Sequence, residues 1–496
     1  MNRFVATAGL ALAISSGLAQ LAPGAVGSAA HLRLAGSLDP SFGSGGVVKG
    51  SGERINAIAL EPDGRIFVLE SGSLARYLPD GSVDPSFARG SNGATDFYGA
   101  ALGVQPDGKI VVAGVGKPVS AGIDSEFAVA RYNPDGTSDS SFGTDGVVKT
   151  VIPGAPITCG DASWSAGANA LAILPGGDIV AAGSAGGEVG CATLDGYSSF
   201  ALVRYTSDGS LDPTFGNGGI VQTSFDGDDD LSGIAVQPDG KIVATGSAGF
   251  VHGEGTSAMA LARYEPDGSL DPDFGIDGKA TTDPKLSYLV GGPPTLRNGK
   301  ILVAGSTSSD GRPPWFPVLA RYDANGDVDS TFGRHGLAEI RRNLGEPTAM
   351  LRQSDGKTLI AESSSRQGPS IVVRFLPNGR LDGSFGRGGI VSLGDATWSL
   401  ATQPDRKILV GRGDGSSWAL ARLNGGNNCV VPRVGGKTVA GATSALRTSY
   451  CRRGRITRRF SAGVTRGRVI STAPRLGARL PGGSNVDLVV SKGRRP

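Results

Sequence analysis

At 496 residues the chain is too long for one ordinary hydrophobic core, so it forms either several domains or a repeat array. It contains 80 glycines but is 39% hydrophobic, which excludes a disordered low-complexity chain and favours a turn-rich all-β protein. The net charge of only +3 conceals two oppositely charged parts: residues 1–428 hold 33 basic and 44 acidic residues, and residues 429–496 hold 15 and one.

Residues 1–30 have the layout of a secretory signal peptide. Arg3 precedes an apolar stretch from Phe4 to Ile14, and the segment ends in the small residues Ser28-Ala29-Ala30. The stretch is shorter than a membrane anchor requires, and no later segment is long and apolar enough to cross a bilayer. We therefore expect cleavage before His31 and a secreted, extracellular protein without a transmembrane segment.

Three markers recur seven times each, in the same cyclic order. They are the aromatic of a Phe-Gly turn, a turn best written QPDGK, and the tripeptide ARY. The six intervals between the first turn aromatic, Phe42, and the last, Phe385, average about 57 residues, a period typical of solenoids and propellers.

Each repeat contains four short β-rich runs, such as GGIVQTSF, LSGIAVQPDG, KIVATGS and SAMALARYEPDG. Pro and Gly of QPDGK suit a type I turn with a bulge between two antiparallel strands. The runs are apolar on both faces, which indicates sheets covered on both sides.

The predicted fold is all-β: a seven-bladed β-propeller of four-stranded blades over residues 31–424, followed by a linker at 425–428 and a small α+β domain. An open β-solenoid is the alternative, but it gives no reason for seven units, and neither end of the array has a capping segment. The string RYEPDGSLDPDFG is interpreted as the corner leading from the last strand of one blade into the next. The repeats leave open whether the closing blade combines strands from both ends of the array.

The recurring text QPDGKIVVAG, ALARYNPDG and SLDPSFG resembles the delta-60 repeat family, known from secreted bacterial proteins. The resemblance covers about residues 36–424. It implies a propeller and an exported location, and it implies no catalytic residues, because the family has none in common.

An arginine precedes the aromatic of the ARY marker in every unit, and an aspartate recurs in every LDPSFG corner. The arginines are Arg76, Arg131, Arg204, Arg263, Arg321, Arg374 and Arg422, and the aspartates are Asp39, Asp84, Asp139, Asp212, Asp271, Asp329 and Asp382. The arginines could form an anion-binding crown. Equal numbers and a constant offset instead favour structural pairs with bidentate hydrogen bonds.

Four cysteines fit an oxidising compartment, and locality favours disulfides Cys159–Cys191 and Cys429–Cys451 over the other pairings. Zinc is the rival, but no C-x-x-C spacing occurs and no histidine lies near either pair. We expect no metal: the acidic run from Asp226 to Asp230 lacks the spacing of a calcium loop and is interpreted as a solvated turn.

We expect no catalytic residues and no cofactor. No nucleophile elbow, H-E-x-x-H motif or phosphate-binding loop occurs, and the histidines His31, His252 and His335 lack partner spacing.

The C-terminal residues 429–496 read as a small module with a short strand, an amphipathic helix and three further strands. Val439, Ala442, Ala445 and Leu446 share one face of the helix. The opening VPRVGGKT and the ending LVVSKG resemble a PASTA domain. PASTA domains occur outside bacterial cells, and some recognise peptidoglycan fragments.

The charge of this module, +14 against −11 for the rest of the chain, makes it a candidate for binding anionic polymers. The candidate residues for polyanion or cell-wall binding are Arg452, Arg453, Arg455, Arg458 and Arg459. A solvated basic face without a ligand is the alternative. Nucleic acid is not expected outside the cell.

These observations predict an exported, non-enzymatic envelope protein, expected to be a monomer, whose propeller binds a partner protein or acts as a scaffold. The module would attach it to peptidoglycan or an anionic envelope polymer. The alternative is an extracellular glycosidase or lyase with two carboxylates at one mouth of the propeller channel. A propeller dehydrogenase is disfavoured, because only four tryptophans are available to dock a cofactor.

Overall fold

The computed structural model describes residues 35–70, 73–88, 90–91, 97–117, 123–153, 164–188, 196–249, 257–282, 287–290, 293–308, 316–340, 342, 344–363, 370–425, 429–480 and 484–495. Within these segments, no helix combines the length and the apolar character needed to span a membrane.

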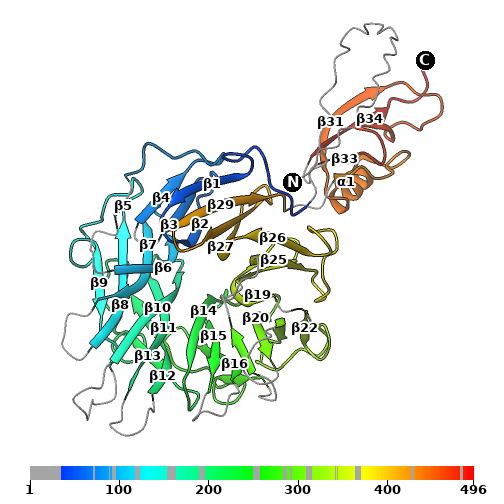
Figure 1. The fold of residues 1–496 in the computed structure, drawn as a ribbon. Helices are drawn as coiled ribbons and strands as arrows, with labels where there is room; N and C mark the ends of the chain where they lie inside the picture. Colours follow the sequence, from blue (N-terminus) through cyan, green and yellow to red (C-terminus); the bar gives the residue numbers. More distant parts are fainter. Residues whose placement is uncertain are drawn as a thin grey trace, which may run out of the picture. The chain divides into compact units, whose positions relative to one another are not determined.

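The propeller consists of seven four-stranded sheets, called blades, arranged around an axis (Figure 1). Blade 1 consists of β2 (Ile55–Leu60), β3 (Ile66–Glu70), β4 (Ser73–Tyr77) and β5 (Gly90–Ser91). Blade 2 consists of β6 (Phe97–Val104), β7 (Ile110–Gly116), β8 (Ile123–Tyr132) and β9 (Val147–Thr150). Blade 3 consists of β10 (Trp164–Ile173), β11 (Ile179–Glu188), β12 (Gly196–Tyr205) and β13 (Ile220–Thr223). A short parallel pairing of β10 with β8 joins blades 2 and 3 into one hydrogen-bonded sheet.

Blades 4 to 6 follow the same plan. Blade 4 consists of β14 (Asp230–Val236), β15 (Ile242–Ala248), β16 (Ala258–Tyr264) and β17 (Lys279–Thr281). Blade 5 consists of β18 (Ser287–Val290) and β19 (Thr295–Arg297), β20 (Lys300–Ser308), β21 (Phe316–Tyr322) and β22 (Leu337–Glu339). Blade 6 consists of β23 (Glu346–Arg352), β24 (Thr358–Ser363), β25 (Ser370–Phe375) and β26 (Ile390–Gly394). In blade 5 the first strand is divided into β18 and β19, which both pair with β20.

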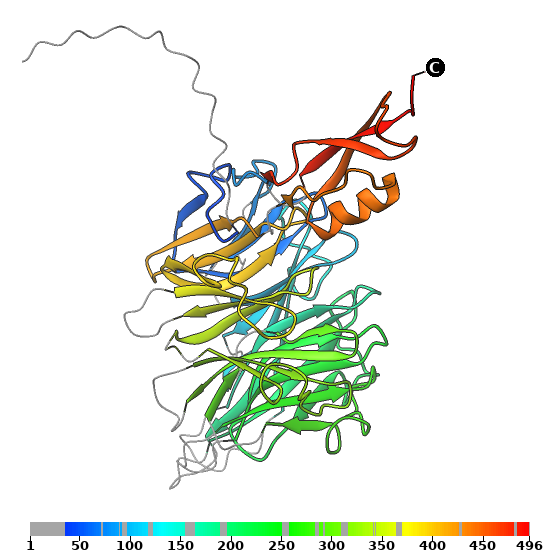
Figure 2. The same ribbon diagram turned by 90° about the vertical axis from the view of Figure 1, so that its right-hand side faces the viewer.

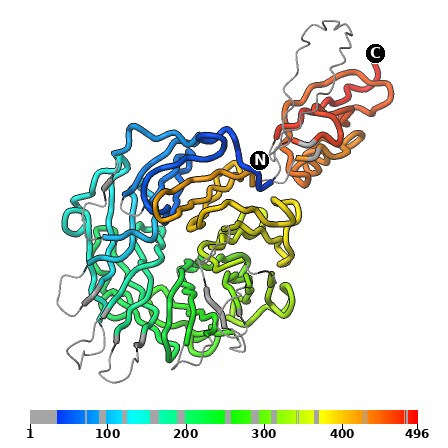
Figure 3. The backbone as a smooth tube through the Cα atoms, in the orientation of Figure 1, coloured from blue at the N-terminus to red at the C-terminus, as the bar shows by residue number. Residues whose placement is uncertain are grey.

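Blade 7 combines strands from both ends of the array, which answers the question that the repeats leave open. Its first three strands are β27 (Ala396–Thr402), β28 (Ile408–Gly413) and β29 (Ser417–Leu423). Its fourth strand is β1 (Val47–Ser51), which pairs antiparallel with β29. In Figure 3 the blue β1 and the orange β29 lie side by side. The ring is therefore closed by backbone hydrogen bonds between the two ends of the array.

The hydrophobic core lies between neighbouring blades. One cluster joins Phe67 and Leu69 of blade 1 to Ile110 and Val112 of blade 2, and all four side chains are fully buried. Equivalent clusters fill the other interfaces and are rich in alanine, which lets the sheets approach closely. Both faces of a strand such as β16 are consequently buried, as its uninterrupted apolar sequence predicts.

The QPDGK turns form as predicted between the first two strands of a blade. In blade 4 the amide of Gln237 donates to the carbonyl of Lys241, and that of Gly240 donates to the carbonyl of Gln237. Gly240 has a φ of 87°, a left-handed conformation that glycine adopts without a steric penalty. The sequence thus selects a hairpin with a glycine bulge.

The interpretation of the repeated string as a corner between blades is wrong. The string joins the third strand of a blade to the fourth strand of the same blade, because β12 pairs with β13 and β16 pairs with β17. The corner has 14 residues in five blades, spanning 133–146, 206–219, 265–278, 323–336 and 376–389, and 12 residues in blade 1, at 78–89. Counting markers gives the period of a repeat but not its starting point, so the expected unit was shifted by one strand relative to the blade.

The C-terminal module has one helix, α1 (Val439–Thr448), and five strands. The strands β31 (Arg452–Arg459), β34 (Asn485–Ser491) and β32 (Val469–Ala473) form a sheet in that order, and β30 (Cys429–Val430) pairs with β33 (Arg479–Leu480). The predicted helix stripe is confirmed, since Ala442 and Leu446 are fully buried and Val439 and Ala445 pack against the same core.

Candidate functional site

The strands of each blade alternate in direction, so successive connections lie on two opposite faces of the propeller (Figure 2). The face that we call the turn face carries the QPDGK turns and the corners. The opposite face, the loop face, carries the links between blades and the connections between second and third strands. These connections range from two residues at 71–72 to nine at 249–257, whereas the corner has 14 residues in five blades and 12 in blade 1. Variation between blades is therefore concentrated on the loop face.

The recurring arginines and aspartates pair on the turn face, as the structural interpretation predicts. In six blades Nε of the arginine donates to Oδ2 of the corner aspartate at 2.5–2.9 Å, and in blade 7 the pair is Nη2 of Arg422 with Asp39 at 3.0 Å. The expected bidentate geometry is wrong, because only one nitrogen of each arginine pairs with the carboxylate. The other nitrogens bind elsewhere or, as with Nη2 of Arg374, have no hydrogen-bond partner within the described residues. In blade 2, Nη2 of Arg131 donates to the hydroxyl of Ser141 at 3.2 Å.

The third nitrogen of each arginine reaches into the next blade. Nη1 of Arg76 in blade 1 donates to the carbonyl of Pro134 in blade 2 at 2.7 Å, and every other blade repeats the contact. The acceptors for Arg131, Arg204, Arg263, Arg321, Arg374 and Arg422 are Ser207, Pro266, Ala324, Pro377, Gly425 and Pro79. We call these contacts the latch ring, since the last one returns from blade 7 to blade 1.

Each latch arginine also lies over the phenylalanine of its own corner. The distances from the guanidinium carbon to the ring centroid are 4.3–4.8 Å, as in Arg374 over Phe385. With ring, carboxylate and carbonyl partners, the arginines are structural and do not form an anion-binding crown.

The corner aspartates receive a second cation in most blades from the lysine of QPDGK. Lys407 lies 2.9 Å from Asp39, and Lys357 lies 2.8 Å from Asp382. Burial acts to raise the pKa of Asp382, but hydrogen bonds from Lys357 and Ser384 outweigh it, so the pKa falls to about 2. These carboxylates are therefore held ionised in the fold.

The loop face contains a cavity of about 460 Å³ where blades 6, 7 and 1 meet. Its lining comes from the two residues before β2, the start of β23, the end of β24, the start of β27, and the end of β28 with the turn that follows it. The lining residues are Glu53, Arg54, Glu346, Pro347, Thr348, Ser363, Ala396, Trp398, Gly413, Asp414 and Gly415. The repeats do not prescribe the charged and aromatic members of this set, so these residues could not be identified from the repeat pattern.

Arg54 and Trp398 are fixed against each other in this cavity. The guanidinium carbon of Arg54 lies 4.3 Å from the ring centroid of Trp398. Nε of Arg54 donates to Asn56 Oδ1 at 2.9 Å, and the amide nitrogen of Asn56 donates to the Gly99 carbonyl in blade 2 at 2.7 Å. A hydrogen-bonded chain thus positions the cation over the aromatic ring.

The same three blades depart from the repeat at one position of the second strand. Gly114, Gly183, Gly246 and Gly305 occupy it in blades 2 to 5, whereas blades 6, 7 and 1 have Glu362, Arg412 and Glu70. All three substituted side chains are buried. Burial raises the pKa of Glu362 well above its usual value, and neither of its carboxyl oxygens has a hydrogen-bond partner.

No group of three or more His, Cys, Asp or Glu side chains in the described segments could hold a metal ion. The acidic turn is only partly solvated. Asp226, Asp228 and Asp230 are exposed, but Asp229 is fully buried and accepts a hydrogen bond from the amide of Phe225 at 2.6 Å. Asp229 is therefore a structural cap, which corrects the expectation of a wholly solvated turn.

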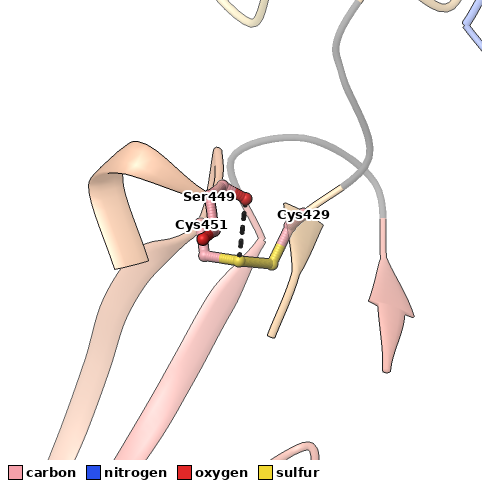
Figure 4. Close-up of a disulfide and its surroundings, with 3 residues drawn as sticks. All are labelled: Cys429, Ser449 and Cys451. Carbon is pink, nitrogen blue, oxygen red and sulfur yellow. Dashed lines mark hydrogen bonds between the residues drawn. A yellow bond between two sulfur atoms is a disulfide. The ribbon is translucent and has the colours of Figure 1, made fainter. Parts of the chain in front are cut away.

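The predicted disulfide Cys429–Cys451 is present, with an S–S distance of 2.03 Å (Figure 4). It joins β30 to the residue that precedes β31, after the end of α1, and Sγ of Cys451 lies 3.3 Å from the carbonyl oxygen of Ser449. Both cysteines belong to the core of the module. Cys159 and Cys191, like His31 and His252, lie outside the described residues.

The five candidate polyanion-binding arginines, Arg452, Arg453, Arg455, Arg458 and Arg459, all lie on β31, the edge strand of the module's sheet. Their side chains are exposed, and none forms an ion pair within the described part of the chain. Asp487 is the sole acid of the module, and its Oδ1 accepts a hydrogen bond from the backbone amide of Arg455 at 2.7 Å.

Seven four-stranded blades closed by β1, followed by a disulfide-bonded α+β module, define a β-propeller protein with an appended small domain. Six segments of the propeller, 61–87, 105–142, 177–215, 237–274, 296–332 and 353–385, match the family described as "Domain of unknown function (DUF5122) beta-propeller". Residues 430–492 match the PASTA domain. The chain is a DUF5122 β-propeller repeat protein with a C-terminal PASTA domain, which confirms both expected resemblances.

Solved structures similar to the chain include propellers. One described as a streptogramin B lyase structure has 11% sequence identity, covers 76% of this chain and 98% of that chain, and has a TM-score of 0.43. The WD40 propeller domain of Doa1 has 12% identity, covers 76% and 95% of the two chains, and has a TM-score of 0.44. The extracellular region of the Ser/Thr kinase PrkC from Staphylococcus aureus has 35% identity over 13% of this chain and 22% of that chain, with a TM-score of 0.13. A search of curated proteins found no match.

Proposed function

We propose that this chain is an exported, non-enzymatic protein of the cell envelope. In this proposal the PASTA domain attaches the chain to peptidoglycan or to an anionic wall polymer, and the propeller acts as a rigid binding or scaffold domain. PASTA domains are extracytoplasmic, and the Cys429–Cys451 disulfide is consistent with an oxidising compartment.

The observation that carries the proposal is the strand β31. Five exposed arginines occupy eight consecutive residues, and the module offers a single acid to balance them. Guanidinium groups bind carboxylates and phosphates through paired hydrogen bonds, so an unbalanced row of them favours a polymer with repeated negative charges. The edge position leaves this row accessible on the side of β31 that does not pair with β34.

The latch ring supports a scaffold role for the propeller. Its arginines connect every blade to the next one through charge-assisted hydrogen bonds, each contributing about 1.5–3 kcal/mol where it is buried. Because these contacts stabilise every interface between blades, the propeller can bind a partner on its loop face while its turn face keeps its shape.

Cosedimentation of the full chain with purified peptidoglycan, with and without its anionic polymers, tests the attachment. The triple variant Arg452→Gln, Arg453→Gln, Arg455→Gln should reduce the bound fraction at least ten-fold at low salt, and added salt should weaken the binding of the unmodified chain. The matched control Arg475→Gln, Arg494→Gln, Arg495→Gln removes the same charge outside β31 and should have a smaller effect. An equal loss of binding in the two triple variants would reject β31 as the binding site. If the unmodified chain sediments with neither peptidoglycan preparation, the attachment itself is rejected.

A further inference from the structure

We propose that the loop-face cavity at blades 6, 7 and 1 binds an uncharged saccharide unit. The inference is independent of the role of the PASTA domain, because every residue that lines the cavity belongs to the propeller. It rests on the shape of the cavity, on its single aromatic platform and on the balance of charge around it.

The volume of the cavity, about 460 Å³, lies within the range of about 300–1,000 Å³ typical of small-molecule sites. Trp398 is half-buried and lines it, so the part of the indole ring that Arg54 leaves uncovered is available at the wall. Aromatic rings pack against the apolar C–H faces of sugars, and they supply a large contact area at little conformational cost. The aromatic side chain gives the site an apolar surface that a purely ionic site would lack.

Trp398 is positioned before any ligand arrives. Arg54 lies over the ring, Asn56 holds Arg54, and the carbonyl of Gly99 holds Asn56. The chain of contacts extends from blade 7 through blade 1 into blade 2, so the orientation of the ring depends on three blades. A preorganised platform binds a ligand with a smaller loss of side-chain entropy.

The polar groups of the lining suit hydroxyl groups. Glu53 is exposed and Glu346 is half-buried, and neither carboxylate forms a hydrogen bond or an ion pair within the described part of the chain. Carboxylates accept hydrogen bonds, and sugar hydroxyls donate them. Ser363, at the end of β24, adds a half-buried hydroxyl that can donate or accept.

The charge of the lining excludes anions. Glu53, Glu346 and Asp414 contribute three negative charges against the single positive charge of Arg54. Asp414 is already occupied, since its Oδ1 accepts hydrogen bonds from Ser416 and Ser417. A uronic acid or a phosphate would meet net repulsion, and the carboxylates do not gather into a metal site in the described segments. A neutral sugar satisfies the acceptors without this penalty.

Titration of the full chain with a neutral trisaccharide of β-linked N-acetylglucosamine, followed by tryptophan fluorescence and calorimetry, tests the proposal. We expect saturable binding, with at least ten-fold weaker binding of a trisaccharide of uronic acids. Trp398→Ala and Glu346→Gln should each weaken binding ten-fold or more. Glu346→Gln retains the shape of the side chain, so it remains informative if Trp398→Ala unfolds the blade.

The matched control is Arg452→Gln, Arg453→Gln, Arg455→Gln, which should bind the trisaccharide as the unmodified chain does. A loss in this control would place the sugar on the PASTA domain and overturn the proposal. Stronger binding of the uronic trisaccharide, unchanged affinity in Glu346→Gln, or release of new reducing ends from the probe would also overturn it.

Discussion

Arg422 and Asp39 form an ion pair of 3.0 Å between Nη2 and Oδ2, although they stand at opposite ends of the repeat array. Arg422 also donates to the carbonyl of Pro79 in blade 1. The closing blade therefore has the same side-chain contacts to its neighbours as blades whose strands are continuous in sequence. The propeller is therefore closed both by the pairing of β1 with β29 and by the latch-ring contact between Arg422 and Pro79.

The latch ring should be strongest where it is most buried. The side chain of Arg374 is 0% exposed, and that of Arg321 is 19% exposed with a long contact of 3.5 Å to Pro377. We expect Arg374→Ala to lower the free energy of unfolding by about 3 kcal/mol, because it removes the fully buried one of the two cations that pair with Asp382. We expect Arg321→Ala to lower it by about 1 kcal/mol. Urea denaturation measures both, and equal losses would contradict the role of burial.

A control for this comparison is Arg387→Ala, which removes an exposed arginine from the same corner that follows Arg374. It should change stability by less than about 0.5 kcal/mol. A large loss in this variant would show that charge alone, and not the latch contacts, stabilises the corner.

The corner aspartates should make the propeller sensitive to acid. Burial acts to raise the pKa of Asp39 and of Asp271, but lysine and other hydrogen bonds outweigh it, and each pKa falls to about 2 from an ordinary 3.8. A carboxylate whose pKa is lowered by folding contributes stability that is present above the ordinary pKa. That stability is lost as the pH falls through the folded pKa. We expect the urea midpoint to fall steeply between about pH 4 and pH 2.

Asp271→Asn should weaken this acid dependence, because one depressed carboxylate no longer titrates, at the cost of lower stability at pH 7. Urea midpoints of the variant and the unmodified chain across the same pH series measure the difference. If the two curves of urea midpoint against pH run parallel, the loss of stability in acid does not come from the corner aspartates.

The count of blades and the pairing of arginine with aspartate could be predicted from the sequence, because both depend on markers that every unit repeats. The position of the corner could not, since a cyclic pattern has no starting point until backbone pairing defines the blade. The inter-blade bond of Arg131 to Ser207 was also missed. Its acceptor is a main-chain carbonyl, which no side chain identifies.

The candidate cavity could not be predicted from the sequence, for a different reason. Arg54 and Trp398 come from opposite ends of the array, and only ring closure brings them together. The longest interval between two turn phenylalanines runs from Phe142 to Phe215, and residues 154–163 and 189–195 within it lie outside the described residues. A position-by-position comparison of the second strands would have found a nearer signal. Glu70, Glu362 and Arg412 replace glycine in three consecutive blades around the cavity.

Glu362 should destabilise the propeller increasingly as the pH rises. Its carboxyl is fully buried without a hydrogen-bond partner, and burial raises its pKa well above the usual value. The folded state therefore holds a proton that the unfolded chain releases, so stability falls as the pH rises above the ordinary pKa of glutamate. We expect Glu362→Gln to be more stable than the unmodified chain, with a difference that widens from pH 6 to pH 9 in thermal denaturation.

The control for Glu362 is Glu346→Gln in the same blade, at a half-buried site on the cavity. This variant should show no gain that widens with pH. A gain of the same size at both positions would mean that the total negative charge of the chain, and not the burial of Glu362, causes the effect.

The Cys429–Cys451 disulfide should stabilise the PASTA domain and leave the propeller unchanged. The two cysteines are 22 residues apart, and cross-linking a loop of this length restricts the unfolded chain by about 3 kcal/mol. Replacing both with serine in the full chain should therefore increase amide hydrogen exchange in β31, β32 and β34. Exchange in β28 and β29 should stay the same, which mass spectrometry of peptides from each domain resolves.

Because both sulfur atoms belong to the core of the module, Cys429→Ala with Cys451→Ala separates the loss of the cross-link from the burial of two hydroxyl groups. Unchanged exchange in the alanine variant would show that packing around Leu446 and Val486, and not the covalent link, stabilises the domain.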